Sequence, residues 1–388
     1  MERGPSVFNA FKAEFGHIFR DRQVVLILVC SLVFYSFFYP FPYQAEVERD
    51  IPVVVVDQDN TALSRTLVRM TRSAETVRVV DQVPEFEAAK DWVYSRKANG
   101  VLVIPNEFQR RLLRGEQASV ALYADAGSFI TYKQVFSGIY AASKTLSAGV
   151  EIKRLRASGM AADQAMAMRD PLALSYVKLF NPAGGYGSYV IPIVFFLLLQ
   201  QTLVMGMGML GGTARETGNM AYFAGSSRGE NPVSAAAGKG MAHFCIYAVH
   251  SLYCFGIMAR VYQFPHQGAI QDEILFVIPF LLSVIFGSMA LATFFRQREI
   301  AIFVAVFTAL PLMFMSRVSW PSEMIPDYLE KALVFIPCIP GVEGFLRISA
   351  MGAGLDQVRG AYVTLWILAL VYFCLASLRF WQLQRRAH

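Results

Sequence analysis

The most restrictive feature of this sequence is an alternation between long runs that lack charged side chains and one continuous charged segment. An apolar run covers 24–43, frequent charges occupy 44–180, and further apolar runs fill most of 188–378. About 20 apolar residues are needed for an α-helix to cross the hydrocarbon core of a bilayer. The composition agrees, because 55% of the 388 residues are hydrophobic and 16% are charged, whereas soluble domains average about 45–50% and about 25%. The sequence therefore predicts an integral membrane protein.

The apolar runs predict six membrane-spanning helices, one before the charged segment and five after it. The predicted spans are 24–43, 188–212, 241–261, 274–295, 300–315 and 362–378. The first run has the basic flank of a signal peptide, but bulky Phe41 and Pro42 stand where cleavage needs small residues. We therefore interpret it as an uncleaved span. The predicted fold class is an α-helical integral membrane protein with an α/β external domain inserted between its first and second transmembrane helices.

The segment 1–23 predicts an amphipathic helix on the cytoplasmic surface of the membrane, because aromatic side chains recur at helical spacing. The alternative is a plain cytosolic tail. The apolar face holds Val7, Phe8, Phe11, Phe15, Ile18 and Phe19, and the polar face holds Lys12, Glu14, Arg20 and Arg22.

The charged segment 44–180 predicts a separate α/β domain. Short runs rich in β-branched residues alternate with stretches of helical periodicity, and this order favours a mostly parallel or mixed sheet. The segment contains no cysteine, so the predicted domain needs no disulfide bond in an oxidising compartment. The predicted strands lie at 51–57, 77–80, 100–105 and 118–124.

The stretch 316–351 is apolar and helical in pattern but is interrupted by several prolines. Broken helices at membrane depth are tolerated only against protein or a water-filled cavity. We therefore predict re-entrant or interfacial external helices before the last span, with an ordinary external loop as the alternative.

Basic residues give the orientation. With six spans, the segments 1–23, 213–240, 296–299 and 379–388 fall on one side of the membrane, and each carries arginine. An excess of Lys and Arg marks cytoplasmic segments. The prediction is a multi-pass protein of the bacterial inner (cell) membrane, with both termini cytoplasmic and 44–180 in the periplasm. The net charge of +6 thus reflects orientation, and we expect no nucleic-acid partner.

The sequence lacks the motifs of nucleotide hydrolysis and of zinc-dependent catalysis. There is no P-loop, because Gly238-Lys239-Gly240 lacks the preceding glycine spacing and the following hydroxyl. No HExxH motif and no Cys/His cluster occurs. We therefore expect no enzymatic activity, metal or cofactor on this chain. Most spans also lack the ionisable residues that ion-coupled carriers use, so the energy for transport is expected from a cytoplasmic partner.

The cytoplasmic coupling loop 213–240 is the expected contact for that partner. Arg215 and Glu216 offer ion pairs, and Gly218 allows a tight turn. The loop ends at Gly238 and Lys239. Between Gly218 and Gly238 the loop contains the apolar residues Met220, Tyr222 and Phe223, which belong to no predicted span. A short helix presenting such residues fits a partner's groove; the alternative is a turn that skims the membrane.

These residues resemble the type-2 ABC-transporter permease family, also called type V exporters, whose members carry a large external domain. The residues Arg215-Glu216-x-Gly218, followed by Gly238-Lys239, resemble the family's coupling segment, although 219–223 departs from its usual continuation. The segment from Gly100 to Gly115 resembles a family motif in the external domain. The stretch from Trp320-Pro321 through Pro337 to Arg347 resembles its external re-entrant helices.

The resemblance implies a mechanism. Two permease chains, identical or different, form a dimer, and each engages a cytosolic ABC ATPase subunit that binds ATP and Mg²⁺. A periplasmic adaptor and membrane lipid are further partners of this layout. The implied function is export of an amphipathic or hydrophobic substrate, such as a lipid, glycan, drug or peptide.

A candidate external gate follows from the re-entrant segment. Its residues are Trp320, Pro321, Pro337, Glu343 and Arg347. Glu343 and Arg347 are spaced i, i+4, so they share one face of a helix and can pair. The hypothesis is that they gate the exit, and the alternative is a structural ion pair. Two other functions stay open for the whole chain, namely a membrane-anchored external sensor or binding protein and an ion-coupled carrier.

Overall fold

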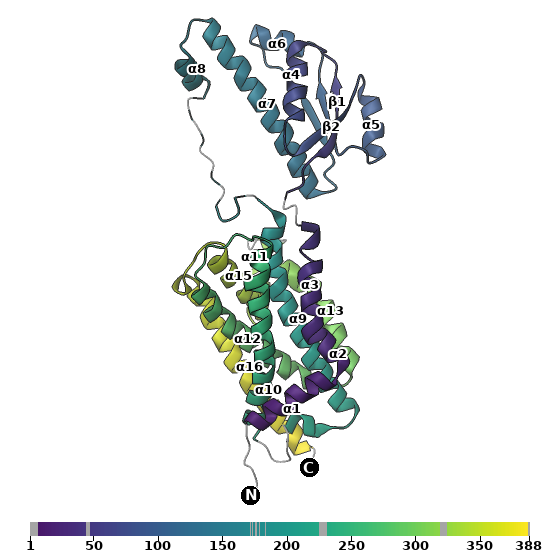
Figure 1. The fold of residues 1–388 in the computed structure, drawn as a ribbon, viewed down its shortest axis with the longest axis vertical. Coiled ribbons are helices and arrows are strands. Elements are labelled where there is room, and N and C mark those ends of the chain that lie inside the picture. Colours follow the sequence, from purple (N-terminus) through teal and green to yellow (C-terminus); the bar gives the residue numbers. More distant parts are fainter. Residues whose placement is uncertain are drawn as a thin grey trace. The chain divides into compact units, whose positions relative to one another are not determined.

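The computed structural model describes residues 7–43, 47–170, 184–224, 231–318 and 324–386, together with 172, 174, 177 and 179–182. The chain forms two compact units (Figure 1). One unit is the continuous segment 47–177, and the other contains the chain on both sides of it. The α/β unit is therefore a single insertion into a helical unit.

The α/β unit is built on a four-stranded sheet of order β2-β1-β3-β4. Strand β1 pairs in parallel with β2 and β3, whereas β4 is antiparallel to β3, so the sheet is mixed. The strands are β1 (Ile51–Asp57), β2 (Val77–Val83), β3 (Gly100–Ile104) and β4 (Ala121–Ala124), and the helices are α4 (Ala62–Arg72), α5 (Phe86–Tyr94), α6 (Phe108–Arg114), α7 (Phe129–Ala157) and α8 (Ala162–Arg169).

Strand β1 explains why the sequence contains an unbroken run of valines. Val53 and Val55 pack in a core with side chains of α4 and α7, and Val54 and Val56 pack in a second core with Ala89 of α5. Successive side chains of a strand point to opposite faces of the sheet. A strand covered on both faces therefore reads as a continuous apolar run.

The helical unit contains six helical segments long and apolar enough to cross a membrane, within the described ranges. They are 22–43, 186–216, 232–261, 270–292, 298–316 and 355–385. Each predicted span coincides with one of them. The elements are α1 (Val7–Arg20), α2 (Arg22–Val25), η1 (Leu26–Cys30), α3 (Ser31–Phe38), η2 (Phe41–Tyr43), α9 (Tyr186–Glu216), η3 (Met220–Ala224), α10 (Pro232–Ser251), η4 (Leu252–Met258), α11 (Ala259–Val261), α12 (Ile270–Ala292), α13 (Arg298–Met313), η5 (Phe314–Val318), α14 (Asp327–Leu333), α15 (Cys338–Ser349), η7 (Leu355–Val358) and α16 (Arg359–Arg386).

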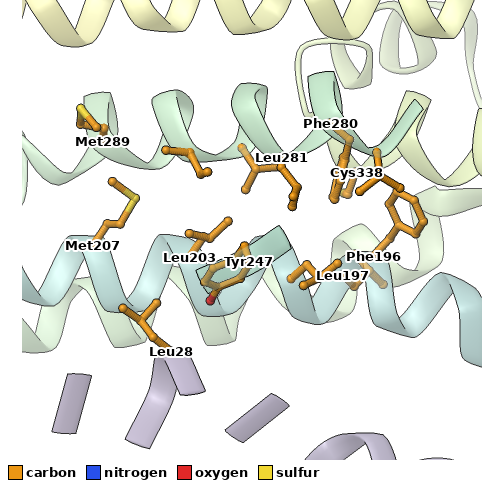
Figure 2. Close-up of a cluster of buried hydrophobic side chains, with 14 of the residues drawn as sticks. Leu28, Phe196, Leu197, Leu203, Met207, Tyr247, Phe280, Leu281, Met289 and Cys338 are labelled. Atoms are coloured by element: carbon orange, nitrogen blue, oxygen red, sulfur yellow. The ribbon is translucent and has the colours of Figure 1, made fainter. Parts of the chain in front are cut away.

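Helix α9 is the centre of the helical unit, because most of its side chains are buried. Figure 2 shows Leu203 and Met207 of α9 pointing toward Leu281 and Met289 of α12, with Leu28 on the opposite side of α9.

The glycines near the end of α9 permit close packing. A Cβ at Gly212 would lie 2.6 Å from the carbonyl oxygen of Gln297, so only glycine allows this approach.

The helix boundaries correct the sequence prediction at the coupling loop. We expected a loop over 213–240, but α9 continues to Glu216 and α10 already begins at Pro232. The side chain of Asn231 accepts a hydrogen bond from the backbone N–H of Val233, and Pro232 occupies the first turn. Both are helix-start signals. The stretch without span character is therefore much shorter than expected.

The segment before α16 contains two helices joined by a sharp bend. The axes of α14 and α15 differ by 88°, an arrangement typical of a broken span or a re-entrant loop. At the bend, the backbone N–H of Cys338 donates to Oε1 of Gln200 at 2.9 Å. This buried hydrogen bond fixes the start of α15 against α9.

Candidate functional site

Helix α1 lies against α10 at one end of the helical unit, which we call the α1 end (Figure 1). Its buried face consists of Ala10, Glu14 and Ile18, spaced four residues apart and hence on one side of a helix. Phe15 and Phe19 are exposed. The sequence placed Glu14 on the polar outer face, and the structure corrects this, because Glu14 points into the protein with no exposed surface.

The crossing of α1 and α10 is close because of Gly238. A Cβ at this position would overlap the backbone carbonyl oxygen of Val7 and would lie 2.6 Å from the Cβ of Ala10. The absence of a side chain therefore lets α1 approach α10, and this approach brings Glu14 within reach of the next residue on α10, Lys239.

Glu14 is the centre of a buried polar cluster that joins three elements. Its carboxylate forms an ion pair with the ammonium group of Lys239. The hydroxyl of Tyr222, in η3, donates to Oε1 of Glu14 at 2.9 Å. The Lys239 Nζ also lies 3.5 Å from the centroid of the Tyr222 ring, and Nε2 of His243 lies 3.9 Å from Oε1 of Glu14. We call Glu14, Tyr222, Lys239 and His243 the Glu14 cluster.

The charge state of the cluster follows from its surroundings. Burial raises the pKa of Glu14, but the positive charge of Lys239 and the contacts with His17 and His243 together outweigh burial, and the pKa of Glu14 lies well below its usual range. Burial and the adjacent Glu14 carboxylate raise the pKa of Tyr222 well above its usual value. Glu14 is therefore a carboxylate and Tyr222 a neutral hydrogen-bond donor at physiological pH.

A second polar contact anchors the junction of α1 and α2. The guanidinium of Arg298, in α13, donates to both carboxylate oxygens of Asp21, at 2.6 and 2.8 Å. Arg298 also donates to Oγ1 of Thr213, in α9, at 3.2 Å. The hydrogen bond from Arg298 is the main cause of the lowered pKa of Asp21. Asp21 also accepts from two backbone N–H groups at the start of α2, so it caps that helix.

A third contact joins the ends of α9, α12 and α16. Arg215 donates to the backbone carbonyl oxygen of Thr293 at 2.6 Å. Nε of Arg379 donates to the side-chain oxygen Oγ1 of the same threonine at 3.3 Å. Thr293 is the C-cap of α12. The α1 end is thus held together by side chains from α1, η3, α9, α10, α12, α13 and α16.

The predicted coupling residues divide into two groups. Glu216 and Gly218 are exposed at the end of α9, and Gly218 has φ +68°, a conformation that glycine favours. Gly238 and Lys239 are instead buried against α1. Lys239 therefore does not present its ammonium group on the surface, and any role in coupling acts through Glu14.

Sequence reasoning missed the parts that Glu14, Asp21, Tyr222 and Arg298 play at this end. A signal for Glu14 was present, since it lies four residues from both Ala10 and Ile18. Its partner is 225 residues away, and no local pattern identifies such a partner.

Three of the five predicted gate residues, Pro337, Glu343 and Arg347, lie in or directly before α15. Pro337 immediately precedes α15. Glu343 and Arg347 both line a cavity of about 230 Å³ between α15 and the start of α16, so they share one face of α15, as their spacing predicts. The ion pairs formed among the described residues do not include one between these two side chains. Trp320 and Pro321 lie outside the described residues.

Comparisons with known proteins agree with this architecture. The family described as "ABC-2 family transporter protein" matches residues 22–378. The chain is also similar to the linearmycin resistance permease protein LnrN of Bacillus subtilis (strain 168), with 21% identity over 379 residues. This similarity covers 93% of the present chain and 95% of LnrN. The match therefore includes the α/β unit as well as the spans.

Proposed function

The chain belongs to the ABC-2 family of transporter proteins, and from this premise we propose that it is the permease subunit of an exporter driven by a separate ATPase. Members of this family are non-catalytic membrane subunits of ABC transporters, and the family implies an ATPase partner. ATP and Mg²⁺ would be bound by that partner, since the present sequence has no P-loop.

We place the ATPase contact at the α1 end. The observation that carries this proposal is the Glu14 cluster, in which Tyr222 of η3 and Lys239 of α10 both bind a carboxylate of α1. Force applied to η3 would reach α1 and α10 together through these contacts. Glu216 and Gly218 precede η3 and are exposed, so they are available to a partner.

The proposed orientation has the α1 end in the cytoplasm. Arg20, Arg22, Arg215 and Arg298 all lie in the elements of this end, in agreement with the excess of positive charge in cytoplasmic segments. The unit 47–177 would then be external, in the periplasm, and the protein would reside in the bacterial inner membrane.

The proposed transporter contains two permease chains, identical or different, as the family resemblance implies. The substrate would cross between them and leave past the cavity lined by Glu343 and Arg347. The name of LnrN refers to resistance to linearmycin. Together with the apolar spans, this favours an amphipathic or hydrophobic substrate over an ion. The sensor and ion-coupled carrier alternatives lose support, because family membership points to a transporter subunit with an ATPase.

The proposal is tested by purifying the full chain from its native membrane in mild detergent and identifying co-purifying proteins by mass spectrometry. We expect a stoichiometric protein with a P-loop motif, and ATP hydrolysis by the reconstituted complex that rises with an amphipathic substrate. Glu216→Ala should reduce the amount of the P-loop protein that co-purifies. Glu116→Ala, at an exposed glutamate of the α/β unit, should leave that amount unchanged. Transport by the chain alone in liposomes, without ATP hydrolysis, would overturn the proposal.

A further inference from the structure

A cavity of about 390 Å³ lies next to the Glu14 cluster, between the α1–α2 junction and the end of α9. This volume is within the range of about 300–1,000 Å³ that is typical of small-molecule sites. The cavity lining combines charged, polar and apolar side chains from α1, α2, α9 and η3. Tyr222 of the Glu14 cluster is part of this lining, as are Arg20 and Arg22.

The cavity carries positive charge that the protein does not neutralise. Within the described part of the chain, neither Arg20 nor Arg22 takes part in an ion pair. The one carboxylate in the lining, Asp21, is already bound by both terminal nitrogens of Arg298. Two guanidinium groups are therefore available to an anion at the rim.

A neutral polar side and an apolar side complete the site. Thr213, Thr217 and Asn219 provide hydroxyl and amide groups, whereas Leu210 and Ala214 provide an apolar wall from α9. His17 also lines the cavity, but its Nδ1 atom lies 3.9 Å from Oε2 of Glu14 and so faces the Glu14 cluster. The lining thus suits a ligand with an anionic group and an adjoining hydrocarbon part.

The location of the cavity selects the source of such a ligand. Phe15 and Phe19 of α1 are exposed, as in helices that lie in the interface of a membrane. The cavity is beside this helix and against the end of the span α9. A lipid headgroup would therefore reach it from the same interface.

We propose that this cavity binds the phosphate group of an anionic phospholipid. A guanidinium fork matches phosphate oxygens with two parallel hydrogen bonds, and basic pockets between membrane helices bind anionic headgroups. Bound there, the lipid would connect the α1–α2 junction to the end of α9 and η3. The proposal concerns the isolated permease and does not rest on the proposed ATPase partner.

The experiment measures lipid retention by the full chain with native mass spectrometry, using phosphatidylglycerol and phosphatidylcholine as probes. We expect preferential retention of phosphatidylglycerol. Arg20→Gln together with Arg22→Gln should weaken it about 30-fold, which corresponds to about 1 kcal/mol for each arginine. Lys12→Gln is the matched control, because Lys12 is an exposed cation on the same helix but does not line the cavity. Arg20→Lys with Arg22→Lys, which keeps the charge but removes the guanidinium fork, should bind more strongly than the double glutamine variant and more weakly than the natural protein.

Each outcome decides the proposal. Competition by inorganic phosphate at low concentration would overturn the lipid proposal in favour of a soluble phosphate ligand. Unchanged phosphatidylglycerol retention in the double glutamine variant, or an equal loss in Lys12→Gln, would overturn the proposal. If the double glutamine variant retains phosphatidylglycerol but no longer co-purifies with the ATPase, the lipid proposal is overturned in favour of a contact with that protein. Size-exclusion profiles and thermal unfolding verify that every variant is folded.

Discussion

The carboxylate of Glu14 on α1 is paired with the ammonium group of Lys239 on α10, and both side chains are buried. A buried charge is costly unless it is paired and hydrogen-bonded. Glu14 meets this requirement through Lys239 and Tyr222 together. The pair therefore holds the surface helix to the span bundle in one defined position.

Removal of one partner of this pair should strongly destabilise the protein. Glu14→Ala leaves the charge of Lys239 buried without its carboxylate, and we expect a loss of about 3–5 kcal/mol. The measurement is unfolding of the purified chain in detergent. Replacing both partners, with Glu14→Leu and Lys239→Met, should recover most of the loss, because no unpaired charge then remains. A double variant no more stable than the single one would contradict this account.

The stability of the protein should fall with acidification in a way that depends on Glu14. Because the folded-state pKa of Glu14 lies below its ordinary value of 4.5, the carboxylate stabilises the fold above that value and loses this effect as the pH falls through the folded-state pKa. The thermal midpoint of the natural protein should decrease below about pH 5. Glu14→Gln should be less stable near neutrality and should show a shallower decrease. Parallel pH profiles would exclude Glu14 as the cause.

Two substitutions at Asp21 should separate its two roles. Asp21→Asn removes the ion pair with Arg298 but keeps an oxygen that can cap α2, and we expect a loss of about 1 kcal/mol because the pair is partly exposed. Asp21→Ala removes the cap as well and should cost about 1 kcal/mol more. Unfolding in denaturant provides both values. Equal losses would mean that the cap contributes nothing.

A larger residue at Gly238 should release α1 from α10. In Gly238→Val the added atoms overlap the backbone of Val7, and overpacking of this kind costs about 1–3 kcal/mol. We expect faster amide hydrogen exchange in 7–20. Gly256→Ala is the matched control in the same span, because a Cβ there meets no atom within 4 Å. Similar exchange in the two variants would refute the role of Gly238.

The sequence predicted the elements of this fold better than their contacts. Runs such as 188–212 identify candidate spans because their length and hydrophobicity can be read directly from the sequence. The valines of β1 identify a buried strand because a strand covered on both faces has an unbroken apolar sequence. The start of α10 at Pro232 was missed although Asn231 and Pro232 are local signals, because the absence of an apolar run beyond them favoured a loop.

The candidate site could be predicted only in part from the sequence, because several of its contacts join residues that are far apart along the chain. Arg215, Glu216 and Gly218 were named from a local pattern, and their role in coupling stays a prediction. The spacing of Glu14 from Ala10 and Ile18 indicates a buried position, but no local pattern identifies its distant partner Lys239. The spacing of Glu343 and Arg347 predicted that both side chains lie on one face of a helix. It could not predict the cavity that this face lines, because the cavity depends on how α15 packs against α16. The position of Asp21 opposite Arg298 likewise depends on tertiary structure alone.

The distance along the chain between Glu14 and Lys239 has a consequence for biosynthesis. The two residues are 225 positions apart, and ribosomes add roughly 5–20 residues per second. Glu14 is therefore synthesised about 10–45 s before Lys239 exists. During that interval the first span is already made, the α/β unit is being completed, and α1 has no acceptor site on α10. Docking of α1 is thus a late step in the maturation of each molecule, and a chain truncated before α10 would leave the glutamate of its first helix without the lysine.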